Sequence, residues 1–158
     1  MAIYMQYNGI DGAVTTQGFI NWIELNSFQW AISRDIGTAA RGALSRESSE
    51  PMIAEVTVTK YMCKSAPKLL QEAVAGPLNK TVIIKFTTTT RDKVDTFLTY
   101  QFDNVGISQY SMSSGGDMPI ESLTLNFTKV METFVGMDPG ISGSPETVGY
   151  DLTLMQKV

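Results

Sequence analysis

The stretch that decides the fold spans residues 108–129 and reads SQYSMSSGGDMPIESLTLNFTK. Its centre is rich in Ser, Gly, Asp and Pro, which favour turns, and polar and apolar residues alternate on both sides of that centre. After the turn, Leu123, Leu125 and Phe127 share one face of an extended chain, and the Ser, Thr and Asn residues between them share the other. The pattern predicts two strands joined by a turn, and it sets the fold class as β.

Alternating stretches of the same kind recur along most of the chain. They fall at residues 2–7, 52–62, 81–90, 96–112 and 147–154. An aromatic-rich stretch at residues 19–33 has no clean polar face, because Phe28 and Trp30 fall on one parity while Ile23 and Leu25 fall on the other. This predicts a bulge or burial on both sides. Many short strands separated by turns favour a mainly β fold of about eight strands, as a closed or nearly closed antiparallel β-barrel or a sandwich.

One segment, residues 65–76, has the pattern of a short amphipathic helix. Ser65 is a good N-cap, Pro67 is acceptable in the first turn, and Gly76 stands where the helix would end. An i, i+4 apolar stripe joins Leu69, Leu70, Ala73 and Val74. We predict that this single helix flanks the sheets or plugs one end of the barrel.

We predict a single domain over residues 1–158 with two long loops, at about residues 34–50 and 136–149. The first is small and polar in composition, and the second is rich in Gly, Ser and Pro. A loop as long as the first, inside a compact domain, is usually functional or disordered in isolation. It also carries three of the chain's few arginines, Arg34, Arg41 and Arg46.

Composition and charge exclude several classes of partner. Lys and Arg total 12 against 16 Asp and Glu, a formal charge of −4, so we expect neither nucleic acid nor an anionic membrane surface as a partner. No apolar run approaches the length of about 20 residues that spans a bilayer, so we expect no membrane insertion. Because no signal peptide follows Met1 and Cys63 is alone, we predict synthesis in a reducing cytoplasm and no intrachain disulfide.

The residue types also argue against an enzyme, a metal site or a cofactor. The chain has no histidine, which removes the commonest general base and most catalytic zinc sites. Residues 113–117 (SSGGD) lack the Gly-Lys-Ser/Thr of a phosphate-binding loop and precede a strand, so we interpret them as a turn. Two carboxylate pairs flank turns, where we expect solvated charges: Asp92 with Asp95, and Asp117 with Glu121.

Several motifs, in the same order, resemble those of the Hcp proteins of bacterial type VI secretion. They are Met1–Tyr4, Gly12, Trp22–Leu25 with Ser27–Trp30, Val58–Lys60 followed by Lys64–Leu69, and Tyr110–Asp117 with Glu121–Lys129. The similarity runs nearly from end to end. It implies a β-barrel subunit with one flanking helix.

The resemblance also implies a function. Six subunits would form a ring, and stacked rings would form a tube that a contracting sheath fires out of the cell. The lumen would hold small effectors, and the protein would reach the extracellular space or a target cell without a signal peptide. The implied partners are further copies of the chain, a VgrG-like spike protein, contractile sheath proteins and effector cargo. The alternative is a free ring that acts as an effector-binding chaperone or adaptor.

Two sites follow from these expectations. We predict that the 34–50 loop reaches a neighbouring subunit in the same or the next ring, with Arg34, Gly37, Arg41, Leu44 and Arg46 at the contact; the alternative is an ordinary surface loop. Gln29 lies on the parity opposite Phe28 and Trp30, so it points away from the core if those aromatics fill it. We predict that Gln29 lines the channel, the alternative being an exposed side chain on the outer wall.

Overall fold

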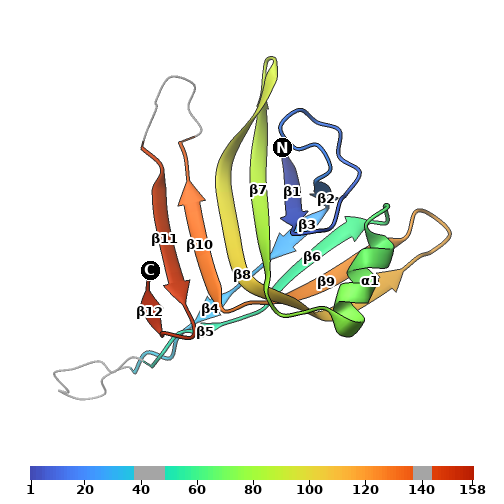
Figure 1. The fold of residues 1–158 in the computed structure, drawn as a ribbon. Coiled ribbons are helices and arrows are strands. Elements are labelled where there is room, and N and C mark those ends of the chain that lie inside the picture. The colour runs from blue at the N-terminus through green and yellow to red at the C-terminus, as the bar shows by residue number, and fades with distance from the viewer. Residues whose placement is uncertain (38–48, 137–143) are drawn as a thin grey trace.

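The computed structural model of the chain describes residues 1–37, 49–136 and 144–158 (Figure 1). These residues form twelve strands and one helix. In chain order the elements are β1 (Ala2–Tyr7), β2 (Ile23–Leu25), β3 (Ser27–Gln29), β4 (Ile32–Ser33), β5 (Met52–Ile53), β6 (Val56–Tyr61), α1 (Ala66–Ala75), β7 (Lys80–Thr90), β8 (Lys93–Ser113), β9 (Ile120–Asn126), β10 (Lys129–Phe134), β11 (Glu146–Asp151) and β12 (Gln156–Lys157). The fold is therefore mainly β with one short helix, as predicted.

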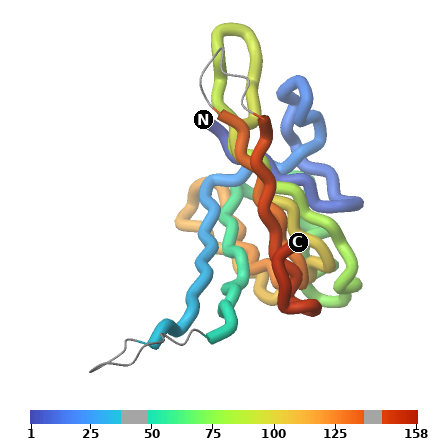
Figure 2. Tube along the Cα trace, turned by 90° about the vertical axis from the view of Figure 1, so that its left-hand side faces the viewer, coloured from blue at the N-terminus to red at the C-terminus, as the bar shows by residue number. Residues whose placement is uncertain are grey.

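All strands except β4 and β5 form two antiparallel sheets that share β8. Sheet A has the order β12-β11-β10-β8-β7-β1-β2, and sheet B has the order β3-β6-β9-β8. The first part of β8, up to Val105, pairs with β7, and the part from Gly106 to Ser113 pairs with β9. The two sheets enclose the core as a nearly closed barrel, which stays open where β10 and β11 face β3 and β4 (Figures 1 and 2).

The bend that carries β8 from one sheet to the other lies at Asn104–Gly106. Asn104 has a positive φ of 56°, which asparagine tolerates better than most residues. At Gly106 a Cβ atom would lie 2.2 Å from a methyl group of Leu78, so glycine lets the segment after the helix lie directly on the strand. The alternating stretch 96–112 therefore belongs to one strand that bends at these residues.

The aromatic-rich stretch 19–33 is also divided between the sheets. Ile23 and Leu25 are buried on β2 in sheet A, whereas Phe28 on β3 packs against the core from sheet B. After Leu25 the chain stops pairing with β1, and the Asn26 N–H donates to the carbonyl oxygen of Thr59 on β6 instead. The inward parity therefore changes at Asn26, which explains why neither face of this stretch is cleanly polar.

The core is the one that alternation predicts. Leu123, Leu125 and Phe127 of the deciding stretch are buried. They meet buried residues of β6, β7 and β8, namely Val56, Val58, Val82, Ile84 and Phe102. A group of aromatic rings fills the open side of the barrel, with Phe28 stacked on Tyr100 at 5.2 Å between ring centroids.

The helix has the predicted bounds but not the predicted apolar face. Leu69 is fully buried and Ala73 packs against the core, yet Leu70 and Val74 are exposed. The expectation of a four-residue buried stripe is therefore wrong, because the helix meets the sheets along a single narrow line. Ser65 precedes the helix but forms no side-chain capping bond; its hydroxyl lies 3.0 Å from the Cys63 sulfur instead.

The first long loop begins as a ribbon that projects from the barrel (Figure 2). In this ribbon β4 pairs with β5, with Ile32 opposite Ile53 and Ser33 opposite Met52. Beyond it, residues 38–48 lie outside the described part of the chain. The same holds for residues 137–143 in the second predicted loop.

Candidate functional site

The outer face of sheet B carries a continuous set of neutral polar side chains. Directly paired residues of antiparallel strands share a face of the sheet. One cross-strand row therefore joins Gln29, Thr57 and Thr124, and the next joins Ser27, Thr59, Ser122 and Ser111. Ser27 and Thr59 are hydrogen-bonded to each other through their hydroxyls at 2.6 Å. The face thus offers hydroxyl and amide groups and no formal charge in these two rows.

Gln29 lies on this polar face, at the strand beside the opening of the barrel. Its side chain is exposed, whereas Phe28 points inward against Phe86 and Tyr100. Trp30 also packs against the core, and its indole N–H donates to the carbonyl oxygen of Ala54 at 3.0 Å. Gln29 therefore points away from the aromatic core, which is the geometry on which the channel prediction depends.

Both edges of sheet B lack a strand partner among the described residues. β3 pairs only with β6, and the Gly106–Ser113 part of β8 pairs only with β9. Such edges present free backbone N–H and C=O groups, and natural proteins normally cover or pair them. An open edge on each side of one sheet is the arrangement through which copies of a chain can join side by side.

The residues predicted at the 34–50 loop fall only partly within the described chain. Arg34 and Gly37 are exposed at the far end of the β4–β5 ribbon, where the Asp35 N–H donates to the Ser49 hydroxyl at 3.0 Å. Arg41, Leu44 and Arg46 lie outside the described residues. Exposed apolar side chains are also present here: Ile32, Ile36 and Met52.

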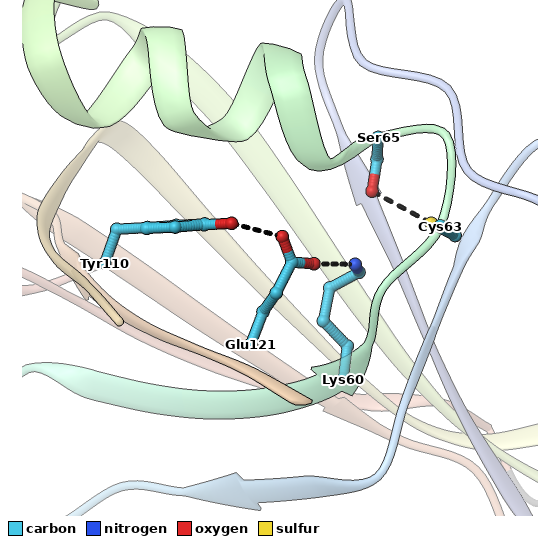
Figure 3. Close-up of polar contacts among 5 residues, drawn as sticks. All are labelled: Lys60, Cys63, Ser65, Tyr110 and Glu121. Atoms are coloured by element: carbon cyan, nitrogen blue, oxygen red, sulfur yellow. Dashed lines mark hydrogen bonds and ion pairs between the residues drawn. The ribbon is translucent and has the colours of Figure 1, made fainter. Parts of the chain in front are cut away.

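A fully buried ion pair lies between β6 and β9, beneath the start of the helix (Figure 3). The Lys60 ammonium donates to the Glu121 carboxylate, and the Tyr110 hydroxyl donates to the other oxygen of that carboxylate. Burial, and then the hydrogen bond to Glu121, raise the pKa of Tyr110 to about 12. The expectation of a solvated Glu121 at a loop edge is wrong, although Asp117 is exposed.

Residue parity could have identified this pair. Lys60 follows Val56 and Val58 on the inward face of β6, and Glu121 precedes Leu123 and Leu125 on the inward face of β9. Because both charged side chains are fully buried, neither is open to a substrate, and their mutual neutralisation gives the pair a structural role.

The described residues contain no group of three or more His, Cys, Asp or Glu side chains that could hold a metal ion. Within the same residues, α1 is far too short to reach across a bilayer.

Comparisons with known proteins agree with this geometry. The model of a family described as "Type VI secretion system effector, Hcp" matches residues 4–134. A solved structure described as that of a type six secretion system protein shares 28% identity over 99% of both chains, with a TM-score of 0.89. Hcp1 from Salmonella typhimurium, at 20% identity, covers 99% of this chain and 98% of its own with a TM-score of 0.76. A type VI secretion system effector from Yersinia pestis, at 18% identity, covers 94% of this chain and 98% of its own with a TM-score of 0.74. No match was found among curated protein sequences.

Proposed function

The chain belongs to the Hcp family of type VI secretion proteins, and on that premise we propose that it is a non-enzymatic subunit of a secretion tube. Six copies join side by side into a ring, and the rings stack into the inner tube. The observation that carries this proposal is that, within residues 1–37, 49–136 and 144–158, sheet B has an unpaired strand edge on each side.

Edge pairing between copies accounts for both open edges at once. If β3 of one copy lies beside the Gly106–Ser113 part of β8 of the next, sheet B continues from subunit to subunit around the ring. This interface is heterologous, because the two edges differ, and it closes only when the rotation between copies completes a circle. Each backbone hydrogen bond formed between two copies adds about 1 kcal/mol to the stability of the interface. Because β3 has only three residues, further contacts are needed to hold a ring together.

In this arrangement the outer face of sheet B becomes the wall of the lumen. Gln29, Thr57 and Ser122 then face the channel with neutral groups that donate and accept hydrogen bonds. Such a wall can contact the polar surface of a small effector without the strong charge pairing that would hold it permanently. We therefore retain Gln29 as a lumen-facing residue.

The β4–β5 ribbon supplies the contact to a neighbouring subunit in the same or the next ring. Its exposed Ile36 and Met52 need a partner surface to leave water, and Arg34 and Gly37 lie at its far end. We propose that the residues beyond it, Arg41, Leu44 and Arg46, extend this contact. The further partners in this proposal are a VgrG-like spike, the contractile sheath and effector cargo, and the protein is exported by the secretion machine.

The mass of the native oligomer tests the ring. Native mass spectrometry of the purified full chain at high concentration should give six copies, and electron microscopy should show rings with a central channel. A monomer or dimer under these conditions would contradict the proposal. Rings that never stack, even at high concentration, would favour a free-ring adaptor over a tube subunit.

Two variants test the assigned surfaces. Replacing residues 38–48 by a short Gly-Ser linker should abolish stacking or ring formation, whereas the same linker in place of Ser114–Gly116, in the β8–β9 turn, should leave both intact. Gln29→Trp should change the density seen in the lumen by electron microscopy and lower the amount of cargo retained. Gln17→Trp, in the exposed loop before β2, is the control and should change neither. Unchanged cargo retention in Gln29→Trp would contradict the lumen assignment.

A further inference from the structure

The inner face of sheet A continues beyond the core into an apolar groove. On β10 and β11, Val130 and Tyr150 pair with each other and Glu132 pairs with Val148, all on the face that bears Phe102 and Tyr100 farther along the sheet. The four residues of β10 and β11, with Trp30, Ile32, Gly149 and Lys157, line a groove of about 360 Å³, which we call the β10–β11 groove. Val148 remains 44% exposed there, although its parity is that of the core.

The helix presents an apolar surface of matching character. Leu70 and Val74 lie one helical turn apart, and Leu78 follows the helix; their side chains are 48%, 78% and 74% exposed. We call these three residues the α1 stripe. Leu69 and Ala73 already pack against the core, so the α1 stripe is not needed for the contact between the helix and the sheets.

The two surfaces lie on opposite sides of the subunit, with α1 on one side and β11 on the other (Figure 1). The α1 stripe belongs to the side of the β8 edge, because α1 packs against β8 and Leu78 lies on Gly106, where the unpaired part of β8 begins. The β10–β11 groove belongs to the side of the β3 edge, because Trp30 and Ile32 follow β3 directly.

We propose that the α1 stripe of one subunit occupies the β10–β11 groove of the next subunit in the ring. This inference rests on the proposed ring. When β8 of one copy pairs with β3 of its neighbour, the helix attached to that β8 comes to the side of the neighbour on which the groove opens. The occupant is therefore a second copy of this chain, and the same contact repeats around the ring.

The chemistry of the two surfaces fits this occupant. The stripe consists of three aliphatic side chains, and the groove is lined mostly by Trp, Ile, Val and Tyr, so each can remove the other from water. Because a protruding surface meets a concave one on the opposite side of the molecule, the contact is head-to-tail and cannot form a two-fold dimer. It also adds apolar area to the short β3 edge, which a stable interface requires.

A cysteine pair tests the contact directly. In a Cys63→Ser background, Val74→Cys combined with Val148→Cys should give a ladder of covalent oligomers up to the hexamer after oxidation or treatment with a short bismaleimide. Each single-cysteine variant should remain monomeric on a denaturing gel. The pair Val74→Cys with Met118→Cys, at the exposed β8–β9 turn, is the control and should give no ladder.

Native mass spectrometry of the same samples separates the two proposals. Intact rings without the ladder would overturn the docking of α1 and leave the ring standing. Absence of the hexamer in the unmodified chain measured beside them, with a folded chain by circular dichroism, would overturn the ring and this inference with it.

A charge placed on the stripe gives a second, independent measurement. Val74→Asp should raise the dissociation constant of the hexamer at least tenfold, as measured by sedimentation velocity. Ala75 is exposed at the next position of the helix and lies off the stripe. Ala75→Asp therefore adds the same charge to the same helix end and should change that dissociation constant less than twofold. Equal effects of the two variants would contradict the docking of the α1 stripe in the β10–β11 groove. The melting curve of each variant's monomer shows whether the chain is still folded.

Discussion

Two buried polar groups in this protein differ in their hydrogen bonding. The Glu121 carboxylate accepts hydrogen bonds from Lys60 and Tyr110, whereas the Tyr7 hydroxyl has no hydrogen-bond partner among the described residues. A buried polar group without a partner costs the free energy of its lost hydration. The first arrangement therefore fixes strands relative to one another, and the second is a local weakness.

Tyr7→Phe should stabilise the folded chain by about 1 kcal/mol, because it removes the unpartnered hydroxyl and keeps the aromatic side chain. Burial, and then the nearby Glu72 charge, raise the pKa of Tyr7 to about 12. The folded state keeps this proton when the unfolded chain has already released it, so the wild type loses stability as the pH rises from about 10 towards that value. The advantage of Tyr7→Phe should therefore grow over this range.

Guanidinium unfolding at neutral and alkaline pH measures this prediction. Tyr110→Phe is the matched control and should be destabilising at neutral pH, because the Tyr110 hydroxyl donates to Glu121. A loss of stability in Tyr7→Phe at neutral pH would contradict the account.

The Lys60–Glu121 pair should show strong coupling in a double-mutant cycle. Lys60→Met or Glu121→Gln alone leaves an uncompensated buried charge and should cost about 3–5 kcal/mol of unfolding free energy. The double variant leaves no buried charge and should cost much less than the sum of the two, as urea unfolding would measure. Additive losses would mean that the two charges do not stabilise each other.

At the level of elements, β8 is the strand on which the architecture depends, because it belongs to both sheets. Its bend at Asn104 needs a left-handed backbone, and the Asn104 amide donates to the Thr128 hydroxyl at 2.8 Å. The polar face and the core of sheet B are therefore oriented by one residue with φ of 56°.

Asn104→Val should cost about 2 kcal/mol, because a β-branched residue is strained at positive φ. Asn104→Gly should cost less than about 1 kcal/mol, since glycine adopts this conformation freely and only an exposed hydrogen bond is lost. Thermal unfolding of the two variants gives the comparison. The reverse order would show that the side-chain bond, and not the backbone, holds the bend.

At the level of the whole molecule, the described residues leave apolar side chains and backbone groups uncovered. Sheet A extends beyond the core that it encloses, sheet B has two edges without a strand partner among the described residues, and the β4–β5 ribbon projects from the barrel. Open strand edges and exposed apolar surfaces of this kind are normally covered in natural proteins, which is the physical basis of the proposed ring.

The melting temperature should therefore depend on protein concentration. If the subunit folds into a ring, mass action stabilises the assembled state, and the melting temperature should rise steadily over a hundredfold increase in protein. Scanning calorimetry measures this shift, and Val74→Asp should flatten it. A melting temperature that does not change with concentration would argue that the folded subunit is monomeric.

Features that depend on neighbours along the chain could be predicted before the fold was known. Alternation with a period of two located the strands and the inward residues Val58, Leu123 and Phe127, because a strand shows its two faces directly in its sequence. Gly76 likewise located the end of the helix. The outward direction of Gln29 followed from the same alternation once Phe28 was placed in the core.

Tertiary structure alone decided which distant groups meet and which surfaces stay uncovered. The change of sheet at Asn26, the pairing of Lys60 with Glu121 across 61 positions, and the exposure of Val74 depend on how the sheets are arranged. Local patterns report which face of an element is apolar. They do not report whether the remainder of the chain is wide enough to cover that face, because burial is a property of the assembled sheets.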